Sequence, residues 1–445
     1  MSEQEKPYMN SEREMFEKLA PEEQDQKIAE AGTLETAIQQ HGLEQALKSM
    51  DEPETELTPE EQEKFERMLN GARNAINAFE IKRSSDGRKG ETLTIVSDPG
   101  AEELFVKALY QAGKEKAGAD CRVVISELPT GPAQPFGKAI GERLMNSDCI
   151  LMVTSFSRSH SQEMVDLMSP HPNEAVAQWK SALQKARGAS FPSSQRFISI
   201  TQTRSEILTD GAAQENMAEM QERLGRLEEL MIAVEKTHVV SENGTDLEID
   251  LKKGKTIIDY GKLGTPGSGA NFPFGEWSCA VDLETTNGTL VIDGVSTPPV
   301  GELDQPITLR IEKGVVVDVQ GGEAAQRLKT ALDEANRIWR EKNPEDKTTN
   351  AYRVAELGIG VNSRAFRYTE SGQRIAPPTS LEGEKGLGTI HVALGKNTLY
   401  GLNKEDPDFN PIAVHIDNVV MNTTVEAEKT DGSKVNLIEN GQARF

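Results

Sequence analysis

The sequence is short of positive charge, aromatic residues and cysteine. Its 445 residues include 49 lysines and arginines against 72 aspartates and glutamates, so the formal net charge is −23. A surface with this charge repels polyphosphate, because nucleic-acid binding depends on lysine and arginine. We therefore expect neither nucleic acid nor an anionic membrane as a partner.

Membrane and secretion signals are also missing. No apolar run approaches the roughly 18 residues of a membrane span. The first residues, MSEQEKPYMNSEREMF, have neither a basic start nor an apolar core. The three cysteines are widely spaced and form no CxxC pair, which argues against a disulfide framework and a thiolate zinc site. A cytoplasmic protein is the resulting expectation.

Three segments differ in pattern. Residues 1–85 are acidic, with helical spacing and a helix start at Thr58-Pro59, and predict a solvated helical extension. Residues 86–237 alternate short apolar strands with helices, one of them over 174–188, and predict a parallel-sheet α/β domain. A long helix is expected over 211–237. No GxGxxG motif follows the first strand, so a dinucleotide site is unsupported.

Residues 238–445 consist mainly of alternating strand sequence broken by turns, and predict a β-rich, barrel-like domain. The apolar run NPIAVHIDNVV carries His415 and Asp417 two residues apart, and alternation puts both on one strand face. His391 lies in a similar strand, LGTIHVALG, with small residues on its own face. One such histidine is usually a core residue, but two in one domain favour a shared role.

Two glutamates add to this set. Glu276 lies between a glycine–proline turn and an apolar strand, and Glu356 is embedded in the apolar segment RVAELGIGVN. Carboxylates in such places are costly unless they are paired or bound to metal. Together with the imidazoles and Asp417 they form a donor set that Zn²⁺, Mn²⁺, Co²⁺ or Fe²⁺ accepts. The sequence therefore predicts a metal-binding domain at the C-terminal end.

Five motifs in this order, NGTDLEIDL, NFPFGEW, AELGIGVN, GTIHVALG and HID, make residues 90–445 resemble the aminopeptidase T family of metallopeptidases. That family has non-peptidase relatives of the dihydroxypyridine dioxygenase type. The resemblance implies a two-domain subunit, a homodimer, and a pair of divalent metals. Matched motif by motif, it implies the metal ligands Glu276, Glu356, His391, His415 and Asp417.

One position departs from the peptidase pattern. The peptidases have a functional tyrosine seven residues after the first histidine, where this chain has Thr398. Tyr400 lies two residues further on and is the candidate for the same role. The form ALGKN in this segment is closer to the non-peptidase relatives.

Two mechanisms follow from the resemblance. The first is a metallo-aminopeptidase, in which two zinc, cobalt or manganese ions activate a water to hydrolyse a peptide and Glu276 or Glu356 acts as general base. The second is a mononuclear Fe(II) dioxygenase that cleaves a dihydroxypyridine ring and uses His391, His415 and Asp417 as ligands. We expect hydrolysis first, ring cleavage as the alternative, and an inactive scaffold least.

Overall fold

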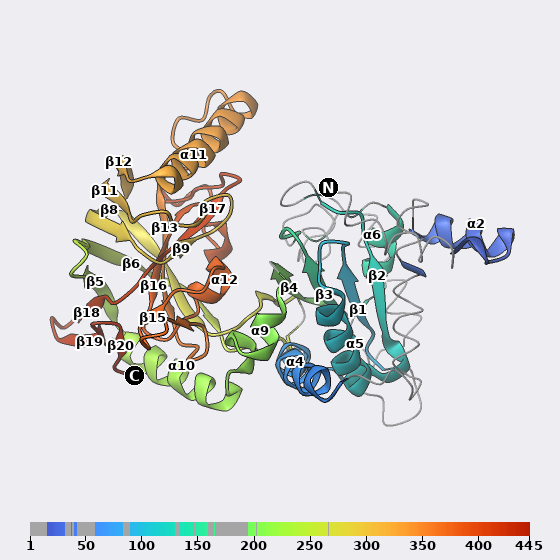
Figure 1. Cartoon of the computed structure of the whole chain (residues 1–445). Helices are drawn as coiled ribbons and strands as arrows, with labels where there is room; N and C mark the ends of the chain where they lie inside the picture. Colours follow the sequence, from blue (N-terminus) through green and yellow to red (C-terminus); the bar gives the residue numbers. More distant parts are fainter. Residues whose placement is uncertain are drawn as a thin grey trace. The chain divides into compact units, whose positions relative to one another are not determined.

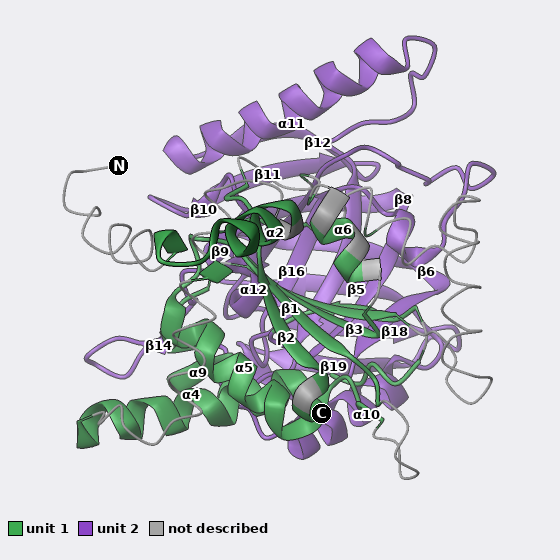
Figure 2. Cartoon of the chain, turned by 90° about the vertical axis from the view of Figure 1, so that its right-hand side faces the viewer, with its two compact units in different colours: residues 1–214, 261–272 green, residues 215–260, 273–445 purple. Residues whose placement is uncertain are grey.

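The computed structural model describes residues 16–31, 58–82, 90–129, 138–145, 147–158, 195–201 and 203–445 except 266, with a few positions between them. The helix expected over 174–188 lies outside the described residues. The chain forms two compact units: residues 1–214 with 261–272, and residues 215–260 with 273–445 (Figure 2). The three-part division expected from the sequence remains a prediction. No helix of the described part is long and apolar enough to cross a membrane.

Unit 1 is built on a parallel sheet with the order β2-β1-β3-β4-β7 (Figure 1). Helices α5 and α6 separate β1, β2 and β3, as the sequence predicts, whereas β7 comes from the segment that returns to this unit. The elements are α2 (Pro21–Ala31), α4 (Pro59–Asn77), β1 (Leu93–Ser97), α5 (Glu103–Ala117), η2 (Gly118–Asp120), β2 (Cys121–Ile125), α6 (Lys138–Met145), β3 (Cys149–Thr154), β4 (Arg196–Thr201), α9 (Ser205–Thr209), η3 (Ala212–Gln214) and β7 (Gly269–Asn271).

Helix α4 begins where the sequence predicts. Thr58 caps it, since its hydroxyl accepts a hydrogen bond from the Glu61 amide and the Glu61 carboxylate accepts one from the Thr58 amide. The helix packs on α5 and buries an apolar face that includes Phe65, Met68 and Leu69. This part of the acidic extension is therefore a packed element of the α/β unit, and the expectation of a solvated arm is wrong for it.

Unit 2 contains a 13-stranded sheet among its described residues, with the main order β10-β9-β17-β16-β13-β8-β6-β5-β18-β19-β20 and with β11 and β12 branching from β8. Helix α10 is shorter than expected because Asn216 caps its first turn and β5 follows it closely. The elements are α10 (Met217–Met231), β5 (Val234–Val240), β6 (Asp246–Asp259), β8 (Glu276–Ile292), β9 (Val295–Ser296), β10 (Gly301–Glu302), β11 (Ile307–Glu312), β12 (Val315–Gln320), α11 (Glu323–Lys342), β13 (Val354–Gly360), β14 (Arg367–Tyr368), β15 (Arg374–Ile375), α12 (Ser380–Gly383), β16 (Ile390–Gly395), η4 (Thr398–Tyr400), β17 (His415–Val420), β18 (Thr424–Lys429), β19 (Lys434–Glu439) and β20 (Gln442–Ala443).

The fold class predicted from the sequence is confirmed: a parallel α/β sheet and a large antiparallel sheet occur in one chain. Helix α11 interrupts the strands of this unit and packs beside β12 (Figure 1). The strands that matter for function are β8, β13, β16 and β17, which are consecutive neighbours in the antiparallel sheet.

The register of these four strands collects the candidate residues on one face. Residues directly opposite one another in antiparallel strands share a face. One row across the sheet pairs Glu356 with Ala393 and Ala393 with Asp417, and the next pairs Gly358 with His391. Alanine and glycine therefore stand between the functional side chains and leave them room.

Gly358 is needed for this arrangement. A Cβ atom at this position would lie 2.0 Å from Cε1 of His391 and 2.2 Å from its Nε2. The imidazole thus lies against the backbone of the neighbouring strand at Gly358, where any side chain would collide with it. This close approach fixes the ring against β13.

We expect Gly358→Ala to lower the free energy of unfolding by about 1–3 kcal/mol, the usual cost of forcing a methyl group into a packed site. Urea denaturation followed by circular dichroism measures it. The control is Gly225→Ala in the interior of α10, where a methyl group meets nothing within 4 Å. This control should gain about 0.5–1 kcal/mol from helix propensity. Equal stability of Gly358→Ala and the wild type would contradict the packing of the ring on the strand.

Candidate functional site: a buried carboxylate–imidazole cluster

Glu356 is at the centre of the cluster. Its Oε1 lies 3.1 Å from Nε2 of His391, and its Oε2 lies 3.2 Å from Nε2 of His415. Asp417 completes the group, with Oδ1 3.1 Å from the same His415 nitrogen. One carboxylate thus contacts both rings, and both rings turn their Nε2 atoms into the same space.

Neighbouring groups hold His415 and Asp417 in place. The Nδ1–H of His415 donates to the carbonyl of Lys396 over 2.7 Å, which leaves Nε2 to face the carboxylates. The hydroxyl of Thr297 donates to Asp417 Oδ2 over 3.2 Å, and the same hydroxyl accepts from the Asp417 amide. Among the described residues, Nδ1 of His391 has no hydrogen-bond partner, so this ring lacks the anchor that fixes His415.

The cluster attracts positive charge. Burial alone would lower the pKa of both histidines, but the carboxylates outweigh it and raise the pKa of His391 to about 9 and that of His415 well above its usual value. Burial alone would raise the pKa of Glu356, yet its hydrogen bonds with the two rings hold that pKa well below the ordinary range. The same field that retains protons on the rings favours a metal cation.

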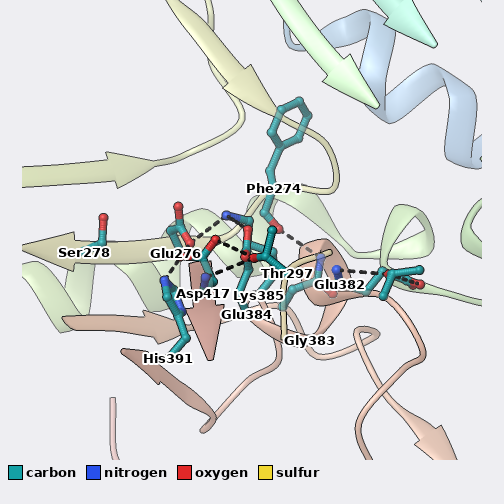
Figure 3. Close-up of polar contacts among 12 residues, drawn as sticks. Phe274, Glu276, Ser278, Thr297, Glu382, Gly383, Glu384, Lys385, His391 and Asp417 are labelled. Atoms are coloured by element: carbon teal, nitrogen blue, oxygen red, sulfur yellow. Dashed lines mark hydrogen bonds and ion pairs between the residues drawn. The ribbon is translucent and has the colours of Figure 1, made fainter. Parts of the chain in front are cut away.

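Glu276 lies beside this group but has a different main partner. Its Oε2 is 3.7 Å from Nε2 of His391 and only 2.6 Å from Nζ of Lys385 (Figure 3). Glu384 also contacts this ammonium, at 3.0 Å. Burial lowers the pKa of Lys385, but the two carboxylates outweigh it and raise the value, so the ammonium stays charged. Burial raises the pKa of Glu384 to about 8.

Tyr400 approaches the same face from the turn after β16. Its ring is buried against Ala280 of β8, and its hydroxyl donates to the hydroxyl of Ser278 over 2.8 Å. Burial and the nearby charge of Glu356 raise the pKa of Tyr400 well above its usual value, so the phenol stays protonated. Tyr400 lies two residues beyond the position of the peptidase tyrosine, and it still reaches this part of the sheet.

The donor atoms suit one divalent metal ion. One ligand atom each from Glu356, His415 and Asp417 lies within 4.8 Å of the others. Imidazole nitrogens and carboxylate oxygens are ligands that Fe²⁺, Mn²⁺, Co²⁺ and Zn²⁺ accept at about 2 Å. Nε2 of His391 adjoins this group through Glu356. The residues present therefore fit a divalent metal.

Sequence reasoning selected Glu276, Glu356, His391, Tyr400, His415 and Asp417, and the structure brings all six to one face of the antiparallel sheet. It missed Lys385, Glu384 and Thr297. Lys385 stands between glycines in EGEKGLG, which predicts an exposed loop. The available signal was its position a few residues before the strand of His391.

The comparisons with known proteins point to one family. The model of the 2,5-dihydroxypyridine 5,6-dioxygenase family matches residues 74–441. A curated 2,5-dihydroxypyridine 5,6-dioxygenase of Pseudomonas putida is 26% identical over 183 residues, which are 40% of this chain and 49% of that protein. The chain thus matches about half the length of this curated relative.

Solved structures support the fold. The 2,5-dihydroxypyridine dioxygenase from Pseudomonas putida KT2440 has a TM-score of 0.55 at 17% identity, covering 84% of this chain and 96% of that chain. Wild-type AmpT from Thermus thermophilus has a TM-score of 0.54 at 16% identity, covering 86% of this chain and all of that one. Both have this fold, so the fold alone does not choose between a peptidase and an oxygenase.

The family match corrects the expected function. The metallo-aminopeptidase, with its hydrolytic role for Glu276 or Glu356, is wrong, and the alternative of a ring-cleaving dioxygenase agrees with the matches. The resemblance to aminopeptidase T holds at the level of the fold. Since the family model spans most of the sequence, this chain belongs to the 2,5-dihydroxypyridine 5,6-dioxygenase family.

Proposed function

We propose that the chain is an Fe(II)-dependent dioxygenase that opens the ring of a dihydroxypyridine. The observation that carries the proposal is the group of donor atoms from Glu356, His415 and Asp417 beside Nε2 of His391, in a chain of this family. Imidazole nitrogen and carboxylate oxygen are the kinds of ligand that non-haem Fe(II) oxygenases use.

Each residue of the cluster has a separate task in this proposal. His415 and the carboxylates of Glu356 and Asp417 would hold the cation. His391 contacts the other oxygen of Glu356, Thr297 orients Asp417, and the Lys396 carbonyl orients His415. Bound ferrous iron supplies the redox chemistry by which dioxygen reacts with an aromatic ring. Both atoms of dioxygen enter the product, so no external reductant is required.

Access to the metal site comes from the side of His415 and Asp417. Their side chains are 22% and 16% exposed, whereas His391 and Glu356 are buried. The substrate therefore meets the cluster on its partly open side. The Tyr400 phenol, protonated and buried against Ala280, would turn its hydrogen bond from Ser278 to a hydroxyl group of the bound ring.

The activity is tested with metal-free protein reloaded with Fe(II) under nitrogen and mixed with 2,5-dihydroxypyridine in aerated buffer. We expect uptake of one dioxygen per substrate, loss of the ring's ultraviolet absorbance, and two heavy oxygen atoms in the product from ¹⁸O₂. The zinc-loaded protein is the control and should be inactive, because zinc has no redox chemistry. Iron-loaded protein that consumes no oxygen with this substrate would contradict the proposal.

We expect His415→Ala to weaken divalent metal binding by at least about 100-fold, since even the loss of a hydrogen-bond partner of a ligand often costs 10–100-fold. Calorimetric titration of the metal-free protein with Mn(II) measures the affinity. The matched control is His238→Ala, which removes another histidine paired with an aspartate, at 2.7 Å from Asp246 but on the solvent-exposed part of the sheet. Equal losses in the two variants would exclude His415 as a ligand.

We expect Tyr400→Phe to keep the metal and to lower kcat for ring opening by about 100-fold, the lower end of the effect of a positioned proton donor. Steady-state oxygen uptake gives kcat and KM, and metal analysis gives the iron content. Leu399→Ala is the control, because this neighbouring side chain is exposed and should leave kcat unchanged. A Tyr400→Phe enzyme with normal kcat would remove the phenol from the mechanism.

A further inference from the structure

Lys385 is a buried cation next to the carboxylate–imidazole cluster, in contact with Glu276 and Glu384. It follows α12, where its amide donates to the Glu382 carbonyl over 3.1 Å and its carbonyl accepts from the Asn362 amide over 2.7 Å. Its side chain is 2% exposed. The backbone is thus fixed at both sides of the residue, and the ammonium has a defined position.

Gly360 makes this position possible. It is the last residue of β13, and a Cβ atom there would lie 2.5 Å from the carbonyl carbon of Lys385 and 2.3 Å from the oxygen of Gly386. The segment after α12 therefore runs directly against the strand that carries Glu356. This contact delivers the lysine to the metal-binding face rather than to solvent.

The charged groups of the cluster divide into two half-sites, one with His415 and Asp417 and the other with His391 and Glu276, and Glu356 lies between them. Glu356 turns one oxygen to His415, which Asp417 also contacts, and the other to His391, which lies 3.7 Å from Glu276. Two-metal sites hold ions about 3.5–4 Å apart. Glu356 lies between the two half-sites and has one oxygen on each side, so its carboxylate would suit a bridge between two ions.

One half-site already contains a positive charge. The Lys385 ammonium lies 2.6 Å from the Glu276 oxygen that faces His391. A divalent ion bound to the same carboxylate would stand next to this ammonium in a buried place, where like charges repel strongly. The half-site of His415 and Asp417 has no lysine or arginine in contact among the described ion pairs.

We propose that the Lys385 ammonium takes the place of a second metal ion beside Glu276, so that the cluster binds one divalent cation through Glu356, His415 and Asp417. The inference rests on the metal centre of the proposed function and adds the number of ions and the residue that sets it. Lys385 is therefore a positioning residue: it holds Glu276 and does not bind the metal.

The test is the number of metal ions bound by the full chain. Metal-free protein is titrated with Zn(II), and the stoichiometry is read by calorimetry and by elemental analysis after gel filtration. We expect one zinc per wild-type chain and two per Lys385→Met chain, because the variant frees Glu276 and His391. Two zinc ions in the cluster of the wild type, or one in a folded Lys385→Met chain, would overturn the inference.

The matched control is Lys252→Met. Lys252 also joins two carboxylates, with Nζ 2.6 Å from Asp406 and in contact with Asp408, but among the described ion pairs no imidazole contacts these groups. This variant should bind one zinc. A second zinc in it would mean that any freed pair of carboxylates takes up metal, and the effect at Lys385 would then carry no meaning.

A second variant covers the case in which Lys385→Met does not fold because Glu276 is left buried without a partner. Lys385→Met with Glu276→Gln removes both charges, and we expect it to bind one zinc with an affinity within about 10-fold of the wild type, a fold-change smaller than that expected for a lost ligand. Loss of zinc by this double variant would show that Glu276 belongs to the first ion's site and would overturn the inference.

The results separate this inference from the proposed function. A wild-type chain that binds one zinc and, loaded with iron, opens no ring contradicts the function and leaves the inference standing. A chain that opens the ring with two ions in the cluster contradicts the inference alone.

Discussion

The buried carboxylate of Glu356 is the group on which the rest of the site depends. A carboxylate removed from water is costly unless charged or hydrogen-bonding partners surround it. Glu356 has a different imidazole at each oxygen, so it sets the positions of His391 and His415 relative to one another. Both rings and Asp417 then surround one space, which attracts a cation because the carboxylates face it.

The antiparallel sheet supplies the rigidity that this carboxylate needs. Four neighbouring strands contribute to the face, and their register sets the rows in which functional and small residues alternate. Strand positions are more precise than loop positions for holding a ligand set. The groups from outside the strands, Tyr400 and Lys385, reach the site through short segments that are themselves held by backbone contacts.

The sequence grouped the candidate side chains on one face because a strand has a period of two. His415 and Asp417 must share a face at that spacing, and so must His391 and the small residues around it. The pairing of their strands is a contact between distant segments, and no local pattern encodes its register. The motifs were therefore needed to group Glu276 and Glu356 with the histidines.

Two parts of the site could not be predicted from the pattern. A lysine between glycines has no local reason to be buried, and Lys385 is buried only because Gly360 admits its backbone and Glu276 meets its charge. The expectation that ranked peptide hydrolysis above ring cleavage was wrong for a related reason. Peptidase and oxygenase were both compatible with the same ligand motifs, and the difference lies in what surrounds those ligands.

The donor set has a consequence for how the protein obtains its metal. Imidazole and carboxylate ligands bind divalent ions in an order that places Fe²⁺ below Co²⁺, Ni²⁺, Cu²⁺ and Zn²⁺. Among the contacts of Glu356, His391, His415 and Asp417 no thiolate or other soft ligand shifts this order toward iron. The cluster therefore does not select iron by affinity. In the proposed iron enzyme, other divalent ions would compete for the cluster, and the share of chains carrying iron would follow the metal supply.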